Sequence, residues 1–330
     1  MEPSYLSLYK SGELAGRVEA LTKHLERCDI CPRNCGVNRL ENETGFCSSG
    51  HLPIVSSYCA HFGEEPALSG NCGSGTIFFG NCNMACVYCQ NYQISQDPAR
   101  QKGHEVSFEK LAEIMLNLQN DQECHNINLV SPTHFVPQIV KALQITVPLG
   151  LHVPLVYNTG GYDSLETIKL LDGIVDIYLP DLRYASNENA IAYSSAPGYA
   201  QNARAAIKEM WRQVGELELN ELNVAEKGLI VRLLILPNEI AGVEESLHWL
   251  AKELSSEVTV SVMSQYSPQH KAPGIPLLSR CVSGGEYAAV VRVMEKLGME
   301  NGWLQEMSST EYYLPDFNRK GHPFELGHTA

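Results

Sequence analysis

The sequence has no apolar run approaching the roughly 20 residues that would cross a bilayer. Its first residues, MEPSYLSLYKSGEL, also lack the basic segment and following apolar stretch of a secretory signal. Positive charge is scarce: 24 Lys and Arg stand against 38 Asp and Glu, a formal net charge of −14. Such a surface is poorly suited to neutralising phosphates, so we expect a cytoplasmic protein that binds neither membrane nor nucleic acid.

The 11 cysteines are concentrated in one part of the chain, and nine of them fall between residues 28 and 89. Disulfides would explain this density in a secreted protein, but no signal segment is seen. Binding of a metal or an iron-sulfur cluster is the better explanation, and it fits a reducing, anaerobic cell.

From residue 76 onward, short apolar runs alternate with segments of helical periodicity. Strands are predicted at 76–79, 127–131, 154–159, 175–180, 229–236 and 259–264. Helices are predicted at 107–119, starting at Ser107, at 135–145, and after each later strand, with ends near 214, 254 and 297. Asp163 and Glu166 match a capping box for the helix after the third strand. Six such β-α units indicate a parallel sheet covered by helices, either an open doubly wound sheet or a barrel-like one.

Polar side chains follow most of these strands. Since the loops after parallel strands form the active-site face of β-α barrels, we expect these side chains to line one site. They are Ser131, Thr133 and His134 after the second strand, Asn158 and Thr159 at the end of the third, Asp181 and Arg183 after the fourth, and Gln265 after the sixth.

After the first predicted strand comes GNCNMACVYCQN, which spaces Cys82, Cys86 and Cys89 as Cys-x3-Cys-x2-Cys. Thiolates bind soft or borderline metals, so zinc and an iron-sulfur cluster are the candidates. A structural zinc site is closed by a fourth ligand, and none follows Cys89 nearby. The next cysteine, Cys124, leads into a strand, where a buried free thiol is expected. Three ligands to a cubane cluster would leave one iron open to another molecule.

This motif, with Tyr88 before its last cysteine and its place after the first of six β-α strands, resembles the radical S-adenosylmethionine (radical SAM) enzymes. Four segments are similar to the pyruvate formate-lyase activating enzyme-like branch: residues 64–95, LPDLRY at 179–184, VRLLILPN at 231–238 and MSQYSP at 263–268. The resemblance implies a partial (β/α)6 TIM-like barrel at 71–310. The other expected parts are a helical segment at 1–27, a cysteine-rich metal-binding segment at 28–70 and a tail at 311–330.

The resemblance also implies cofactors and a mechanism. A 4Fe-4S cluster on Cys82, Cys86 and Cys89 would bind S-adenosylmethionine and, on reduction, cleave it to a 5′-deoxyadenosyl radical that abstracts hydrogen from a substrate. The electron would come from a donor such as a flavodoxin or ferredoxin. Tyr88 is expected near the adenine, the segment after the second strand near the methionine amino group, and groups on the fourth to sixth strands near the carboxylate and ribose.

The sequence departs from the family at one point. Relatives carry Gly-Gly-Glu after the second strand, where this chain has Ser131-Pro132-Thr133-His134. The string at 284–286 opens the last helix, so we interpret it as a helix start. Arg232 lies in an apolar strand and needs an anionic partner, either the cofactor carboxylate or a buried acid such as Asp181 or Asp176.

A second cysteine cluster precedes the barrel, with Cys28, Cys31, Cys35 and Cys47 on turn-rich sequence. Four thiolates suit a closed zinc site or a second iron-sulfur cluster, and Cys59 or Cys72 could replace the fourth ligand. Cys281 is expected to pack beside a helix.

Three functions follow from these patterns. The first is a radical SAM enzyme that activates a glycyl radical enzyme, with a backbone glycine of a partner protein as hydrogen donor. The second keeps the radical chemistry but acts on another protein, a peptide or a small metabolite. The third is a metal-binding or electron-transfer protein without catalysis.

Overall fold

The computed structural model describes residues 2–307, 314–319 and 322–324. Within this part of the chain, nine strands form one sheet in the order β1-β2-β3-β4-β5-β7-β8-β9, with β6 paired to β7. The strands are β1 (Val55–His61), β2 (Ser74–Phe79), β3 (Ile127–Val130), β4 (Leu155–Thr159), β5 (Ile177–Pro180), β6 (Glu218–Leu219), β7 (Ala225–Leu234), β8 (Thr259–Met263) and β9 (Gly302–Leu304).

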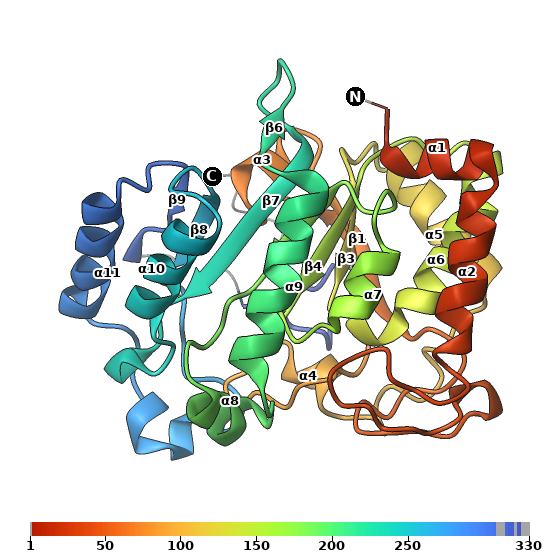
Figure 1. Ribbon diagram of the computed structural model, residues 1–330. Helices are drawn as coiled ribbons and strands as arrows, with labels where there is room; N and C mark the ends of the chain where they lie inside the picture. Colours follow the sequence, from red (N-terminus) through yellow and green to blue (C-terminus); the bar gives the residue numbers. More distant parts are fainter. Residues whose placement is uncertain (1, 308–313, 320–321, 325–330) are drawn as a thin grey trace.

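The six predicted strands are confirmed as β2, β3, β4, β5, β7 and β8, and all are paired in parallel. Helices cover the outer side of this curved sheet (Figure 1). Two edge strands were not predicted: β1, which runs antiparallel to β2, and β9. β1 carries a mostly polar sequence and β9 has only three residues, so neither gives the apolar run of a buried strand.

The main helices follow the predicted β-α order. They are α5 (Phe108–Asn120), α6 (Val136–Thr146), α7 (Leu165–Leu170), α8 (Asn187–Ser194), α9 (Tyr199–Val214), α10 (Val243–Glu253) and α11 (Gly284–Leu297). The short helices α3 (Pro66–Ser69) and α4 (Tyr92–Ser95) lie in loops. Ser107 caps α5 by accepting a bond from the Lys110 N–H, and Ser283 and Glu286 form a capping box on α11. The Gly-Gly-Glu string is therefore a helix start, as predicted.

The N-terminal segment contains two helices, α1 (Ser4–Ser11) and α2 (Glu13–Lys23), where one was expected. They are divided at Gly12, whose φ of 84° lies in the left-handed region that glycine adopts readily. Leu14, Val18 and Leu21 give α2 a buried face. The backbone N–H of Ser4 donates to Asp176 at 2.8 Å, which fixes this segment near the start of β5.

The capping box predicted from Asp163 and Glu166 is wrong. Ser164 takes the N-cap position of α7. Asp163 is fully buried and accepts hydrogen bonds from three hydroxyls, those of Thr133 (2.7 Å), Tyr157 (2.9 Å) and Thr159 (2.7 Å). The carboxylate therefore links β4 to the loop after β3 in the interior. Its three hydroxyl partners are buried, and buried hydroxyls need a hydrogen-bond acceptor, so Asp163 bonds to them and does not cap α7.

The sheet places one residue of each strand toward a shared interior. Phe78, Val130 and Asn158 are in register on β2, β3 and β4, and Asp181 and Arg232 are bridged after β5 and on β7. Because side chains alternate across a strand, apolar residues further toward the strand starts, such as Ile177 and Ile230, fill the barrel below this level. Polar residues are thus concentrated at the strand ends.

Part of the predicted tail lies beside the open edge of the barrel. The Phe317 ring packs edge-on against Phe78 at 5.3 Å, and Phe324 stacks on His61 at 4.1 Å. Residues 311–313, 320–321 and 325–330 of that tail lie outside the described residues. No helix in the described part of the chain is long and apolar enough to cross a membrane.

The first prediction concerns Asp163. Replacement by Ala leaves three buried hydroxyls without their acceptor, so we expect the Asp163→Ala variant to lose about 3 kcal/mol or more of unfolding free energy. Urea unfolding measures this loss. The matched control is Glu221→Ala in the exposed turn between β6 and β7, which should unfold like wild type. Equal midpoints for both variants would contradict the assigned role of Asp163.

Candidate functional site

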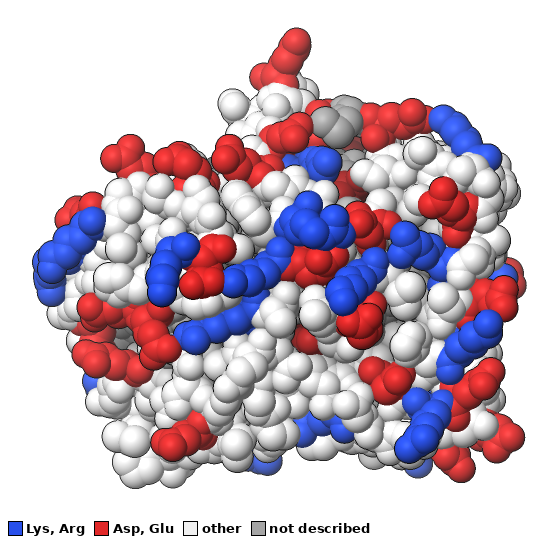
Figure 2. Space-filling view, in the orientation of Figure 1, with Lys and Arg blue, Asp and Glu red and all other residues white. Residues whose placement is uncertain are grey.

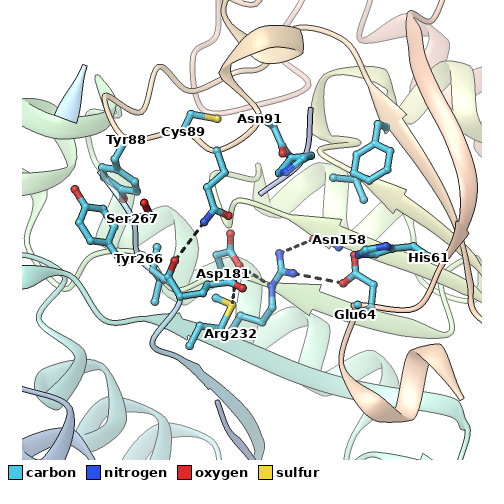
Figure 3. A pocket seen from close by; sticks show the side chains of 18 of the residues that line it. His61, Glu64, Tyr88, Cys89, Asn91, Asn158, Asp181, Arg232, Tyr266 and Ser267 are labelled. Carbon is cyan, nitrogen blue, oxygen red and sulfur yellow. Dashed lines mark hydrogen bonds and ion pairs between the residues drawn. The ribbon is translucent and has the colours of Figure 1, made fainter. Parts of the chain in front are cut away.

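A cavity of about 180 Å³ lies at the carboxyl ends of the strands, inside the curved sheet. Figure 3 shows its polar centre, with Arg232 between Asp181 and Glu64. Tyr88 and Cys89 line it together with residues from β4, β7 and β8. Six of the predicted cofactor-binding residues are among its lining: Tyr88, Asn158, Asp181, Arg183, Arg232 and Gln265.

The loop that carries the three cysteines directly follows β2 and is held by backbone hydrogen bonds. Asn81 donates to the Ile94 carbonyl at 2.8 Å, and its φ of 64° turns the chain out of the strand. Ala85 and Val87 donate to the carbonyls of Ser194 and Tyr193 at the end of α8, at 3.0 and 2.9 Å. We call residues 80–91 the cluster loop; these bonds fix its position at the mouth of the barrel.

Each thiol of the cluster loop has a hydrogen-bonding neighbour. The Met84 N–H donates to Cys82 Sγ at 3.4 Å, the Ser194 hydroxyl donates to Cys86 Sγ at 3.0 Å, and Cys89 Sγ lies 3.3 Å from Ser95 Oγ. Burial raises the pKa of Cys82 to about 12, and the neighbouring Cys86 and Cys89 contribute to this rise. Donors of this kind stabilise thiolates and tune the potential of a cluster that they bind.

A chain of hydroxyls runs from Tyr88 to Cys86 beneath the cluster loop. The Tyr88 hydroxyl donates to that of Tyr184 at 2.7 Å, and Tyr184 is 2.7 Å from the Ser194 hydroxyl, which in turn donates to Cys86. All four residues are buried. The ring of Tyr88, predicted to lie near an adenine, is thereby fixed at one wall of the cavity.

Arg232 finds its partner within the protein. Its Nε donates to Asp181 at 2.8 Å, its Nη2 donates to Asn158 at 2.6 Å, and its Nη1 lies 3.7 Å from Glu64 (Figure 3). The sequence left two kinds of partner for Arg232, the cofactor carboxylate and a buried acid. In the structure Arg232 pairs with a buried acid, Asp181. Asp176 instead accepts the backbone N–H groups of Ser4 and Leu155.

Arg183 has fewer hydrogen-bond partners than Arg232, which also lines the cavity. One of its terminal nitrogens pairs with Asp181, but its buried Nε has no hydrogen-bond partner. Its guanidinium lies against Gly160, where an added Cβ would be 3.4 Å from Nε. An unpaired donor of a guanidinium beside a cavity fits an anionic ligand group such as a carboxylate.

Two acids enter the site from the loop between β1 and α3. Glu64 lines the cavity, and Glu65 is buried with Oε2 unpartnered. Burial raises the pKa of Glu65 to about 7; Arg232 opposes this rise and Glu64 adds to it. Burial likewise raises the pKa of Glu64. Glu64 was not among the predicted site residues, because β1 was not predicted as a strand and its antiparallel direction brings the loop back to the barrel.

The other four predicted cofactor-binding residues lie outside the cavity lining. Thr133 and Thr159 bond to Asp163, as described above. His134 is buried, with Nε2 2.9 Å from the Gly80 carbonyl, and burial lowers its pKa to about 3. Ser131 has a φ of 57° and donates its N–H to the Asn158 carbonyl. These groups shape the loops around the cavity.

Several lining residues were not predicted from the sequence. His61, Phe78 and Phe324 form an aromatic wall at the open edge, and Met263 and Ser267 line the opposite side. Phe324 comes from the end of the chain, and no local pattern could have placed it there.

The remaining cysteines separate into groups. Cys28, Cys31, Cys35 and Cys47 lie outside the cavity, in a segment that packs on the cluster loop. Cys59 and Cys72 do not join them, since both lie near Cys124: burial raises the pKa of Cys59, to which Cys124 contributes, and burial raises the pKa of Cys124, to which Cys72 contributes. Cys124 is buried, as expected, whereas Cys281 is exposed, so the expectation that it packs is wrong.

Comparison with known proteins defines the class of protein. Residues 76–215 match the family model for the radical SAM superfamily. The protein MJ0674 of Methanocaldococcus jannaschii, described as uncharacterized, is 31% identical over 306 residues, 89% of this chain and 82% of its own. A second uncharacterized protein of that organism, MJ0808, is 24% identical over 78% of this chain and 75% of its own.

Two solved structures are also similar to this chain. Methylornithine synthase (PylB) matches with a TM-score of 0.40 and 16% identity over 65% of this chain and 59% of that one. TYW1 with a lysine-pyruvate adduct matches with a TM-score of 0.39 and 9% identity, over 71% of this chain and 78% of that one.

The chain belongs to the radical SAM superfamily. It is a radical SAM enzyme with a mostly parallel α/β barrel, and its cofactors are a 4Fe-4S cluster and S-adenosylmethionine.

The residues of the site suit these two groups. Three neighbouring thiols on one loop, each with a hydrogen-bonding neighbour, are appropriate donors for a cluster. In the described part of the chain no three His, Cys, Asp or Glu side chains are grouped so that they could hold a single metal ion. Each thiolate of a cubane binds a different iron, so convergence on one atom is not required. The free Nε of Arg183 suits a carboxylate.

The second prediction uses the raised pKa of Glu65. An acid whose pKa is higher in the folded protein stabilises the fold below its unfolded pKa, near 4.5, and that stabilisation is lost as the pH rises toward about 7. Wild type should therefore lose stability between pH 5 and 8, and Glu65→Gln should lose less because its side chain stays neutral. Urea midpoints across this range test it, with exposed Glu221→Gln as control. Parallel curves for wild type and Glu65→Gln would refute it.

Proposed function

We propose that this chain binds its 4Fe-4S cluster through Cys82, Cys86 and Cys89 and uses S-adenosylmethionine to abstract hydrogen from a backbone glycine of a partner protein. This is the activity of a glycyl-radical-activating enzyme. The observation that carries it is the position of the cluster loop: it follows β2 directly, and Cys89 and Tyr88 line the same cavity as Arg183 and Asp181.

The chain's residues have distinct parts in this proposal. Arg183 binds the carboxylate of S-adenosylmethionine through its free Nε, while Asp181 holds the guanidinium in place. Tyr88 contacts the adenine, and Asn158 and Gln265 offer amide groups to the ribose and the amino group. Ser131, Thr133, His134 and Thr159 act indirectly, by fixing the loops that carry these residues.

The bound cluster and S-adenosylmethionine supply a 5′-deoxyadenosyl radical, and the protein must keep it from water and stray hydrogen donors. Phe78, Leu234 and Met263 give the cavity an apolar wall beside its polar centre. Arg232 is neutralised by Asp181 and bonded to Asn158, so it gives the floor a fixed geometry. These residues position the cofactor and exclude water.

A protein partner is supported by the surface around the barrel mouth. Phe46, Ile191 and Leu277 expose 44%, 52% and 51% of their surface, and they lie on the cysteine-rich segment, on α8 and after β8. All three segments lie at the end of the barrel to which β7 points (Figure 1). The lower left of the face in Figure 2 is mostly free of charged residues. Exposed apolar side chains at a site entrance are typical of a protein-binding surface.

An electron donor such as a flavodoxin or ferredoxin completes the reaction.

The third prediction tests the cluster. Replacing Cys82, Cys86 and Cys89 together by Ala removes all three thiolates, so the anaerobically reconstituted variant should lose about four irons per chain and form no 5′-deoxyadenosine on reduction. Iron, sulfide and product analysis measure this, with exposed Cys281→Ala as control.

The substrate class is tested in the same assay with candidate partner proteins that carry deuterated glycine. Deuterium in 5′-deoxyadenosine supports the activase. Cleavage without deuterium transfer from any labelled glycine protein would refute the glycine donor while leaving the radical chemistry in place. Unchanged iron in the triple variant would refute the cluster assignment itself.

The fourth prediction concerns Arg183. Arg183→Gln removes the charge of a guanidinium that lines the cavity, and one charge-assisted hydrogen bond contributes about 1.5–3 kcal/mol. The affinity for S-adenosylmethionine should therefore fall about tenfold or more, with unchanged iron content. Anaerobic equilibrium dialysis measures it. The control is Arg280→Gln, whose guanidinium pairs with Glu286 at the start of α11. An affinity equal to wild type would rule out this role.

A further inference from the structure

We propose that Cys28, Cys31, Cys35 and Cys47 bind a second, thiolate-coordinated metal centre, and that this centre holds the cysteine-rich segment (residues 28–51) against the cluster loop. Metal binding here does not depend on the proposed hydrogen abstraction; only its effect on the cluster loop rests on the proposed function.

The fold of the segment brings the four cysteines together. Cys28 donates its N–H to the Val37 carbonyl at 2.8 Å and accepts the Gly36 N–H at 2.9 Å, so the first and third cysteines lie on adjacent stretches of chain. Cys35 packs against Gly45, where an added Cβ would be 2.6 Å from its sulfur. Gly45 is two residues before Cys47, and a residue with a side chain would push Cys35 away from it.

All four cysteines of the segment are free thiols. Cys28, Cys31 and Cys47 are buried, and Cys35 is half-buried. Four free thiols on one short segment, three of them buried, are suited to a soft metal.

Arg39 gives an independent indication of negative charge at this place. Its side chain is fully buried, and its hydrogen bonds go to the carbonyls of Gly50 and His134. Among the described residues it has no carboxylate partner, although a buried guanidinium normally requires an anion. Arg39 lies beside Cys28. A tetrathiolate centre carries net negative charge and would supply the missing partner.

The same segment contacts the cluster loop at two points. Arg33, between Cys31 and Cys35, donates from Nε to the Asn83 carbonyl at 3.0 Å. Asn81 donates to the Ser48 carbonyl at 3.0 Å, directly after Cys47. Figure 1 shows the segment beside α4 and α7 at the end of the barrel where α8 lies. A metal that fixes the four cysteines therefore also fixes the residues that flank Cys82.

The test uses the full-length chain, purified without oxygen in three forms. The Cys82→Ala, Cys86→Ala, Cys89→Ala variant lacks the radical cluster, Cys28→Ser with Cys31→Ser disrupts the second centre, and Cys281→Ser is the control. We expect the first to retain about one zinc or about four irons per chain, and the second to lose this metal while keeping the cluster-loop iron. Either metal supports the proposal. The first variant without zinc or iron would overturn it.

Alkylation of the wild-type protein gives a readout that does not depend on a variant's folding. Mass spectrometry should find Cys28, Cys31, Cys35 and Cys47 protected from iodoacetamide and modified after chelator treatment, with exposed Cys281 modified in both samples. Equal modification before and after chelation, in protein that has kept its native circular dichroism, would overturn the second centre. Loss of S-adenosylmethionine cleavage alone would count against the proposed function and leave this inference standing.

The effect on the cluster loop has its own measurement. Amide hydrogen exchange at residues 80–84 should increase at least several-fold in Cys28→Ser with Cys31→Ser, while exchange in α10, on the other side of the barrel, stays unchanged. Unchanged exchange at 80–84 would show that the centre does not hold the loop.

Discussion

The pairing of Arg232 with Asp181 is the interaction on which the site depends. It lies where β5 meets β7, a junction with two residue pairs besides the backbone bridge between Asp181 and Arg232. A buried ion pair adds little net stability, but removal of either partner leaves an uncompensated charge in the interior. The pair therefore fixes geometry: Arg232 orients Asn158 on β4, and Asp181 orients Arg183 at the cavity.

From this pair, the organisation of the barrel follows. Apolar side chains fill the interior near the strand starts. Polar side chains lie at the strand ends, where the loops leave room for a ligand that can form hydrogen bonds with them. The cluster loop enters at the same level and is fixed by backbone bonds to α8. The thiols of the cluster loop are thus held by backbone geometry, and the charges that line the cavity by one ion pair.

Most of the barrel could be predicted from the sequence because its strands are buried on both faces and give continuous apolar runs. Asn158, Asp181, Arg183 and Gln265 could be assigned to the site since each ends such a strand. Thr133 and Thr159 end strands too, but their hydroxyls bond to each other and to Asp163, and His134 Nε2 lies beside the Gly80 carbonyl. Glu64 and Phe324 reach the cavity from an antiparallel edge strand and from the chain end, and no local pattern marks either of them.

The distribution of cations connects the two cysteine groups. In a chain with a net charge of −14, carboxylates are more numerous than the basic side chains that could pair with them. Yet Arg39 is buried without one, and Arg33 bonds to the carbonyls of Asn83 and Ser195 and covers the Phe46 ring. Arg183 and Arg232 share Asp181. These four arginines have few carboxylate partners, and they lie near the two groups of cysteines. Thiolates that bind a metal carry negative charge. Metal-bound thiolates and the carboxylate of a cofactor would therefore supply the negative charge that the described acids do not provide near these arginines.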